Sequence, residues 1–157
     1  MKLIAHRGNI NGPNPSQENN PNYIDQAIQS GFDVEIDLRY VNKEFYLGHD
    51  DSQYQVSIEW LVEKNNFLWI HCKDFNSLEI LSNISVDFNY FWHERDKYAL
   101  TSQGYIWSYP GQQYSSKTVV VMPEKNDSLK FYSTEENMHM SNYECFAICS
   151  DFVNKIK

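Results

Sequence analysis

The sequence predicts an α/β protein with a largely parallel sheet. Apolar, β-rich runs recur along the chain with turn signals between them, at residues 3–5, 32–38, 67–72, 88–92, 105–107, 119–122 and 146–149. Helical spacing of apolar residues precedes the second, third and fourth runs, at residues 21–31, 57–65 and 77–82. A strand, a helix and a second strand in succession favour a parallel crossover, so the repeated units favour a parallel sheet, open or closed.

The elements are best defined in the first half of the chain. The segment 21–31 begins with Pro21 and ends at Gly31, a residue suited to closing a helix. In the second half the links shorten, because residues 94–103 and 110–117 leave room for one helical turn or none. We therefore expect fewer helices after the fourth strand.

Length and composition favour one globular domain, residues 1–157. A chain of this size can bury a proper core, and apolar residues at 41% with charged residues at 22% are ordinary globular usage. The aromatic share of 15% predicts a core rich in large rings. A formal net charge of −8 argues against a nucleic-acid partner. It leaves room for a small phosphate-bearing ligand, for which a bound cation and a few local bases matter more.

The ends and the cysteines give further expectations. The apolar run before His6 is too short for a signal peptide or a membrane span, so we expect no membrane span and a cytoplasmic location. Cys72, Cys145 and Cys149 lack paired metal-type spacing and are expected to be reduced core residues. His139 lies among polar and acidic residues and is expected on the solvated surface.

His6-Arg7-Gly8 directly follows the first predicted strand. In parallel α/β sheets and barrels, functional residues gather at the carboxyl ends of the strands. The motif therefore marks a candidate site, although taken alone it also fits a plain strand end with a turn glycine.

Glu35 and Asp37 lie two residues apart in a predicted strand, so both carboxylates point to one face of the sheet. Two uncompensated acids on a buried face are costly, and a hard cation such as Mg²⁺ or Ca²⁺ would compensate them. The alternative is an exposed face at the edge of the sheet.

Gly48-His49-Asp50 supplies a second histidine at a chain turn, with Asp50 placed to orient it. The unperturbed pKa of histidine lies near neutrality, which suits proton transfer in both directions. Two histidines and a cation suffice for phosphodiester chemistry, because one imidazole can activate a nucleophile and the other can protonate the leaving alkoxide.

Four short motifs follow one another in the order His6-Arg7-Gly8, Pro15-Ser16-Gln17-Glu18-Asn19, Gly31-Phe32-Asp33-Val34-Glu35-Ile36-Asp37 and Gly48-His49-Asp50. Together they resemble the N-terminal signature of the glycerophosphodiester phosphodiesterases, members of the phospholipase-C-like phosphodiesterase superfamily. The resemblance implies a TIM-type (β/α) barrel, acid and base roles for His6 and His49, and metal-ligand roles for Glu35 and Asp37. A full barrel usually needs about 250 residues, so we expect a compact barrel with reduced or missing outer helices in its second half.

The resemblance extends to two later strands. In Ile70-His71-Cys72-Lys73, Lys73 matches a phosphate-binding base, and His71 stands where the family has a third metal-ligand carboxylate. Histidine at this position makes Mn²⁺ or Zn²⁺ possible beside Mg²⁺ or Ca²⁺. The run 147–151 is similar to the family's last strand, which commonly ends in Thr-Asp.

Three further residues are candidates for the mouth of the site by strand position: His93, Trp107 and Glu124. Trp107 would give an apolar wall to the organic group of a substrate. For His93 and Trp107, ring packing in the core is the competing interpretation.

These observations favour a metal-dependent phosphodiesterase that hydrolyses a small glycerol-phosphate-type phosphodiester, with Arg7 and Lys73 holding the phosphate. The alternative is a non-catalytic module that binds a phosphorylated sugar, polyol or polymer on the same fold. A third possibility is an intramolecular transfer that forms a cyclic phosphate. The sequence leaves the substrate alcohols, the metal and the oligomeric state open.

Overall fold

The computed structural model describes residues 1–125 and 144–156. His139, which we expected on the surface, lies outside these residues. Among the helices of the described part, none is long and apolar enough to cross a membrane.

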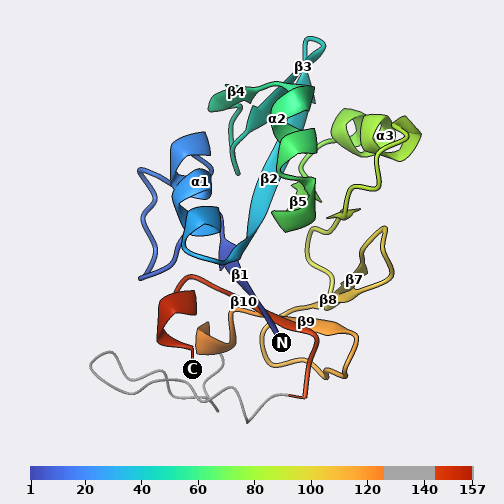
Figure 1. Ribbon diagram of the computed structural model, residues 1–157. Coiled ribbons are helices and arrows are strands. Elements are labelled where there is room, and N and C mark those ends of the chain that lie inside the picture. The colour runs from blue at the N-terminus through green and yellow to red at the C-terminus, as the bar shows by residue number, and fades with distance from the viewer. Residues whose placement is uncertain (126–143, 157) are drawn as a thin grey trace.

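The fold is built on one curled, ten-stranded mixed sheet (Figure 1). Its hydrogen-bonded order is β4-β3-β2-β1-β10-β9-β8-β7, and β5 pairs with the other side of β2 and leads to β6. The strands are β1 (Lys2–His6), β2 (Asp33–Val41), β3 (Glu44–Leu47), β4 (Tyr54–Val56), β5 (Leu68–Cys72), β6 (Tyr90–Phe91), β7 (Tyr98–Leu100), β8 (Ile106–Ser108), β9 (Thr118–Val121) and β10 (Ala147–Ser150).

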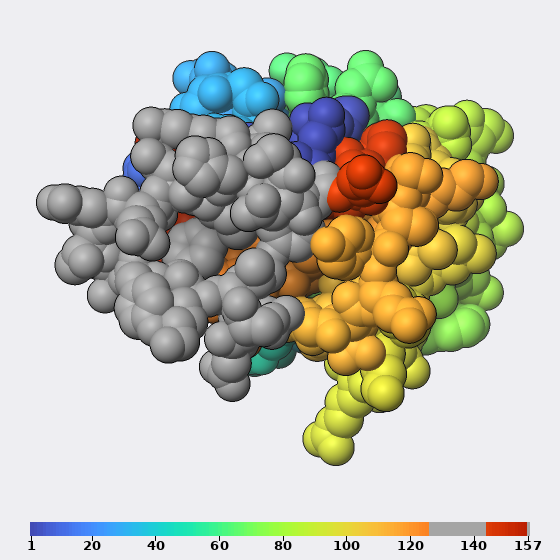
Figure 2. Space-filling view, turned by 90° about the horizontal axis from the view of Figure 1, so that it is seen from below, coloured from blue at the N-terminus to red at the C-terminus, as the bar shows by residue number. Residues whose placement is uncertain are grey.

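The seven predicted strands are all present, as β1, β2, β5, β6, β8, β9 and β10. Every pairing between neighbouring strands of this set is parallel, as predicted. Figure 2 shows the N-terminal residues beside those that lead into β10, which reflects the pairing of Lys2 with Ala147. The first and last strands of the described chain therefore lie together at the centre of the sheet.

Three α-helices cover the first half of the sheet: α1 (Pro21–Gln29), α2 (Ile58–Glu63) and α3 (Phe75–Asn83). The side chains of Asn20, Ser57 and Asp74 cap their N-termini by accepting backbone N–H bonds. Short 3₁₀ turns complete the fold as η1 (Asn65–Phe67), η2 (Pro123–Lys125) and η4 (Val153–Lys155).

The prediction of a TIM-type (β/α) barrel is wrong. The sheet is a half-barrel that mixes parallel and antiparallel strands, and the described residues hold only three short α-helices. The missing helices follow from the short links of the second half, where β7 and β8 form an antiparallel hairpin instead. β2 and β3 form a second antiparallel hairpin. Asn42 and Lys43 connect the two strands, and their φ angles of 53° and 69° suit a tight two-residue turn.

Two apolar clusters hold the sheet. The larger packs Ile36, Leu38 and Ile148 against the helices through Ile24 and Leu81. The smaller cluster is rich in rings, as the composition predicted, and is centred on Trp69, Phe91 and Trp107. Because both clusters immobilise the strands, the side chains at the carboxyl ends of β1, β2, β5 and β10 stand on a rigid edge.

Candidate functional site

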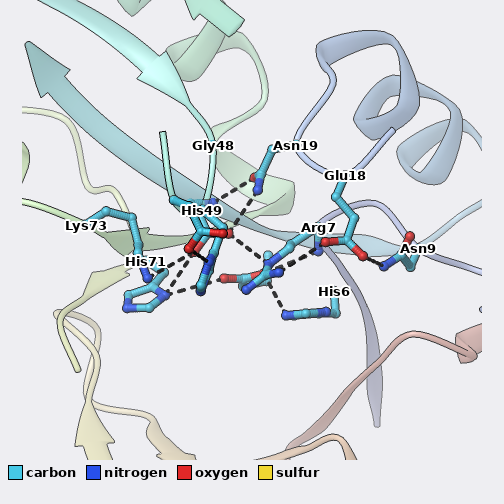
Figure 3. Close-up of polar contacts among 12 residues, drawn as sticks. His6, Arg7, Asn9, Glu18, Asn19, Gly48, His49, His71 and Lys73 are labelled. Carbon is cyan, nitrogen blue, oxygen red and sulfur yellow. Dashed lines mark hydrogen bonds and ion pairs between the residues drawn. The ribbon is translucent and has the colours of Figure 1, made fainter. Parts of the chain in front are cut away.

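The candidate site lies at the edge where the parallel strands end. β1 ends at His6, β2 carries Glu35 and Asp37, β5 carries His71, and β10 leads into Asp151. Figure 3 shows His6, Arg7, His49, His71 and Lys73 pointing toward one region, although they come from distant parts of the chain. His6 and Arg7 stand at the carboxyl end of β1, as the strand-end argument predicted.

A sharp turn after β1 directs Arg7 into the site. Arg7 and Gly8 have φ angles of 52° and 88°, and a Cβ on Gly8 would lie 2.9 Å from the Tyr23 ring. The turn brings Arg7 Nε to 2.9 Å from Asp37 Oδ2 and its terminal nitrogen to 3.1 Å from Glu18 Oε2. Arg7 is therefore held between two carboxylates.

Glu35, Asp37 and His71 form a buried group that could hold a metal ion. One ligand atom of each lies within 4.8 Å of the others. Their exposed fractions are 2%, 0% and 6%, so the interpretation of Glu35 and Asp37 as an exposed edge face is wrong. His71 Nδ1 lies 3.2 Å from Asp37 Oδ1 and 3.8 Å from Glu35 Oε1.

The donor set fits a cation. His71 Nε2 lies 3.1 Å from the backbone oxygen of His93. In the neutral ring this contact places the proton on Nε2, so the lone pair of Nδ1 faces the two carboxylates, as metal-binding histidines require. Asp37 Oδ1 is buried without a hydrogen-bond donor among the described residues. The His93 ring stacks on His71 at 4.4 Å and 6° and fixes its plane.

The two carboxyl groups differ in their electrostatic surroundings. Burial raises the pKa of Glu35, and the charge of Asp37 raises it further. Burial also acts to raise the pKa of Asp37, but its contact with the His71 ring and the charge of Arg7 outweigh this effect, so this pKa is lowered. Asp37 is therefore compensated by the protein, whereas Glu35 lacks full compensation unless a cation is bound.

His6 belongs to a buried imidazole–carboxylate pair. Its Nδ1 lies 2.7 Å from Asp151 Oδ1, and its Nε2 lies 3.9 Å from Glu35 Oε2. Burial lowers the pKa of His6, but the hydrogen bond to Asp151 and the charge of Glu35 outweigh that effect and raise it. Asp151 thus orients the ring and leaves Nε2 facing the site.

His49 lies on the loop after β3, and its Nδ1 is 2.6 Å from Asp50 Oδ1, as the sequence predicted. Burial lowers its pKa more than the charge of Asp37 raises it. The ring lines two adjoining pockets of about 210 and 330 Å³, which also share His71, His93 and Tyr109.

The candidate phosphate ligands lie on either side of Asp37. Arg7 lines the smaller pocket and Lys73 the larger. Lys73 Nζ lies 3.7 Å from Asp37 Oδ1, so both bases contact the same carboxylate.

Trp107 and His93, two of the predicted mouth residues, also line the smaller pocket. Trp107 is 3% exposed and stacks on Phe91 at 4.5 Å, so it packs in the core and walls the pocket at once. Glu124 is not among the lining side chains; its Oε1 accepts a hydrogen bond from the Asp151 amide at 3.1 Å.

Sequence reasoning did not assign site roles to the residues that orient this group. Asn9 Nδ2 donates to Asp151 Oδ1 at 2.8 Å, and Asn19 Nδ2 donates to Asp37 Oδ2 at 2.9 Å. Asp151 itself could have been found, because it follows the last apolar run and the ends of neighbouring parallel strands share an edge. Asn9 lies in the loop after β1, where no pattern marks it, and Asn19 ends the motif Pro15-Ser16-Gln17-Glu18-Asn19, in which no separate role was assigned to it.

Comparison with known proteins gives no relative from which a role could be transferred. The chain matches no protein-family model, and no match emerges among curated proteins or solved structures.

Proposed function

We propose that the chain is a metal-dependent phosphodiesterase that hydrolyses a small glycerol-phosphate-type phosphodiester. The observation that carries the proposal is the meeting of two histidines from separate segments, His6 and His49, around a buried group with metal-ligand chemistry. His6 is oriented by Asp151, and Asp37 is flanked by the bases Arg7 and Lys73.

Glu35, Asp37 and His71 would hold the cation. When bound, it would stabilise negative charge on the phosphoryl oxygens. It would also offset the charge of Asp37, so that Arg7 and Lys73 could turn their donors to the phosphate.

The two imidazoles perform the proton transfers. One accepts a proton from water as the water oxygen forms a bond to phosphorus, and the other gives a proton to the alkoxide as the second phosphorus–oxygen bond breaks. The products are a phosphomonoester and a free alcohol. Attack by a hydroxyl group of the substrate would instead give a cyclic phosphate, which phosphorus NMR of the products distinguishes.

The test uses the purified full chain after metal removal, with Mg²⁺, Ca²⁺, Mn²⁺ or Zn²⁺ added back. The substrates are bis-p-nitrophenyl phosphate and a set of glycerophosphodiesters. We expect metal-dependent hydrolysis that His6→Ala and His49→Ala each reduce to a small residual rate while circular dichroism stays unchanged. His139→Ala, at the histidine that the sequence predicts on the surface, is the matched control.

Hydrolysis that needs no metal and survives both changes would overturn the proposal. One observation favours a second function: a histidine, His71, stands where the resembling family has a third carboxylate. Metal-assisted binding of phosphorylated ligands in calorimetry, without turnover of any diester, would support a non-catalytic binding module instead.

A further inference from the structure

We infer that Arg39 is a positioning residue whose guanidinium holds the His49 loop at a fixed distance from the metal-binding carboxylates. The inference rests on the proposed function, in which His49 transfers a proton. It assigns a role to a residue that neither pocket includes among its lining side chains.

The surroundings of the His49 ring hold it only weakly. The side chain is 40% exposed, and its partner Asp50 is 88% exposed. An ion pair this open to water contributes little, because solvent screens it and both side chains lose freedom to form it. The position of the ring therefore depends on the backbone of the loop.

Arg39 fastens that backbone directly. Its Nε donates to the Gly48 carbonyl at 3.1 Å, and a terminal nitrogen donates to the His49 carbonyl at 2.5 Å. Bonds from an ionised donor are stronger than neutral ones, and the planar fork of arginine can serve two consecutive carbonyls at once. A backbone bond from the Gly48 amide to the Asp37 carbonyl, at 3.0 Å, adds a third tie to β2.

Arg39 and the two carboxylates of the metal-binding group lie on one face of β2. Glu35, Asp37 and Arg39 occupy every second position along β2, so their side chains project from the same face of the strand. A rigid strand thus sets both the carboxylates and the point where the loop is fastened. The separation between the cation site and His49 follows from this arrangement.

The backbone conformation of the His49 loop is tightly constrained. Gly48 has a φ angle of 147°, and a Cβ there would lie 2.0 Å from the Asp51 carbonyl oxygen. The Gln53 amide closes the loop by donating to the Leu47 carbonyl at 3.0 Å. A compact loop of this kind transmits a change at Arg39 to the His49 ring.

The variants are Arg39→Gln and Arg39→Lys, with Arg95→Gln at an exposed arginine as the matched control. In Arg39→Gln we expect kcat for bis-p-nitrophenyl phosphate to fall about 100-fold, the size of effect that a misplacement of about 1 Å produces. Arg39→Lys should lose most of this activity too, because an ammonium cannot reproduce the fork. The dissociation constant for Mn²⁺ should change by less than about twofold, and hydrogen exchange at the Gly48 and Gln53 amides should accelerate.

A double-mutant cycle separates positioning from a general loss of structure. In a His49→Ala background, Arg39→Gln should cause no further loss of residual activity, because its effect acts through His49. An equal loss in both backgrounds, an unchanged kcat in an active wild type, or a parallel loss of Mn²⁺ affinity would overturn the inference. If the wild type hydrolyses no diester, the proposed function fails. In that case, unchanged hydrogen exchange at the Gly48 and Gln53 amides in Arg39→Gln would overturn the inference that Arg39 holds the His49 loop.

Discussion

His6 and Asp151, 145 residues apart in the sequence, are joined by a 2.7 Å contact between Nδ1 and Oδ1 across the parallel pairing of β1 and β10. The contact is buried, and Asn9 donates to the same carboxylate oxygen. Asp151 therefore determines which nitrogen of His6 faces the pocket.

Asp151→Asn tests this relationship. The amide keeps the shape of the carboxylate but removes the charge that helps to raise the pKa of His6, so this pKa should fall. We expect kcat to fall on the order of 100-fold, as for the loss of a well-oriented proton-transfer group. NMR titration of the His6 ring and steady-state kinetics measure the two effects.

The control for Asp151→Asn is Asp87→Asn, at an exposed aspartate. It should leave both quantities unchanged. If Asp151→Asn kept both the pKa of His6 and kcat at their wild-type values, the His6–Asp151 pair would have no part in the reaction.

The strands could be predicted because their signal is local. Runs such as residues 146–149 combine β-branched and apolar residues with turn signals, and each of the seven runs became a strand of the parallel set. The strand-end rule predicted His6 at the end of the first strand, and strand alternation predicted Glu35 and Asp37 on one face of the second.

The barrel could not be predicted correctly, because closure depends on links that the sequence leaves too short for helices. The short links at residues 94–103 and 110–117 predict reduced or missing outer helices in the second half, but the closed barrel implied by the resemblance is wrong. The structure uses the first link for β7, which pairs antiparallel with β8. Arg39 escaped prediction for a different reason: its contacts are tertiary, and it belongs to no pattern that indicates a site. Asn19 ends one of the four signature motifs, but its tertiary contact with Asp37 could not be read from that motif.

The cysteines give a prediction that is independent of function. Burial raises the pKa of Cys72 to about 12 and that of Cys145 to about 11, and it raises the pKa of Cys149 well above its usual range. The thiolate is the reactive form, so all three thiols should react slowly with iodoacetamide near pH 8 in the folded protein.

Mass spectrometry of the alkylated protein counts the modified thiols. Cys145 is partly exposed and should react before Cys72 and Cys149, and all three should react rapidly in concentrated guanidinium. Rapid modification of Cys72 in the folded state would contradict its burial in the core at the end of β5.

His71→Glu should change the metal preference. The variant places three carboxylates in one buried group, which repel one another without a cation, and it gives hard cations a third oxygen ligand. We expect Mg²⁺ and Ca²⁺ to bind more tightly than to the wild type and to raise the melting temperature further. Calorimetry and thermal unfolding with and without metal measure these effects.

The matched control is His71→Gln, which supplies an oxygen donor without charge. It should lose affinity for Mn²⁺ and Zn²⁺ and gain none for Mg²⁺. Equal Mg²⁺ affinity in the wild type and in His71→Glu would argue against cation binding by this group.

Glu35→Gln and Asp37→Asn should have opposite effects on the stability of the metal-free protein. The pKa of Asp37 is lowered on folding, so its ionised form stabilises the fold above the unfolded pKa, and this contribution is lost as the pH falls through the folded pKa. At neutral pH, Asp37→Asn removes the partner of Arg7 and His71 and should cost about 3 kcal/mol of unfolding free energy. The pKa of Glu35 is raised, so its charge opposes folding, and Glu35→Gln should leave the metal-free protein as stable as the wild type or more so.

Denaturant unfolding in EDTA measures the unfolding free energy of both variants, and calorimetry with Mn²⁺ should show that both variants lose metal affinity. Equal destabilisation by the two changes would mean that the carboxylates share one electrostatic environment, which their different partners argue against.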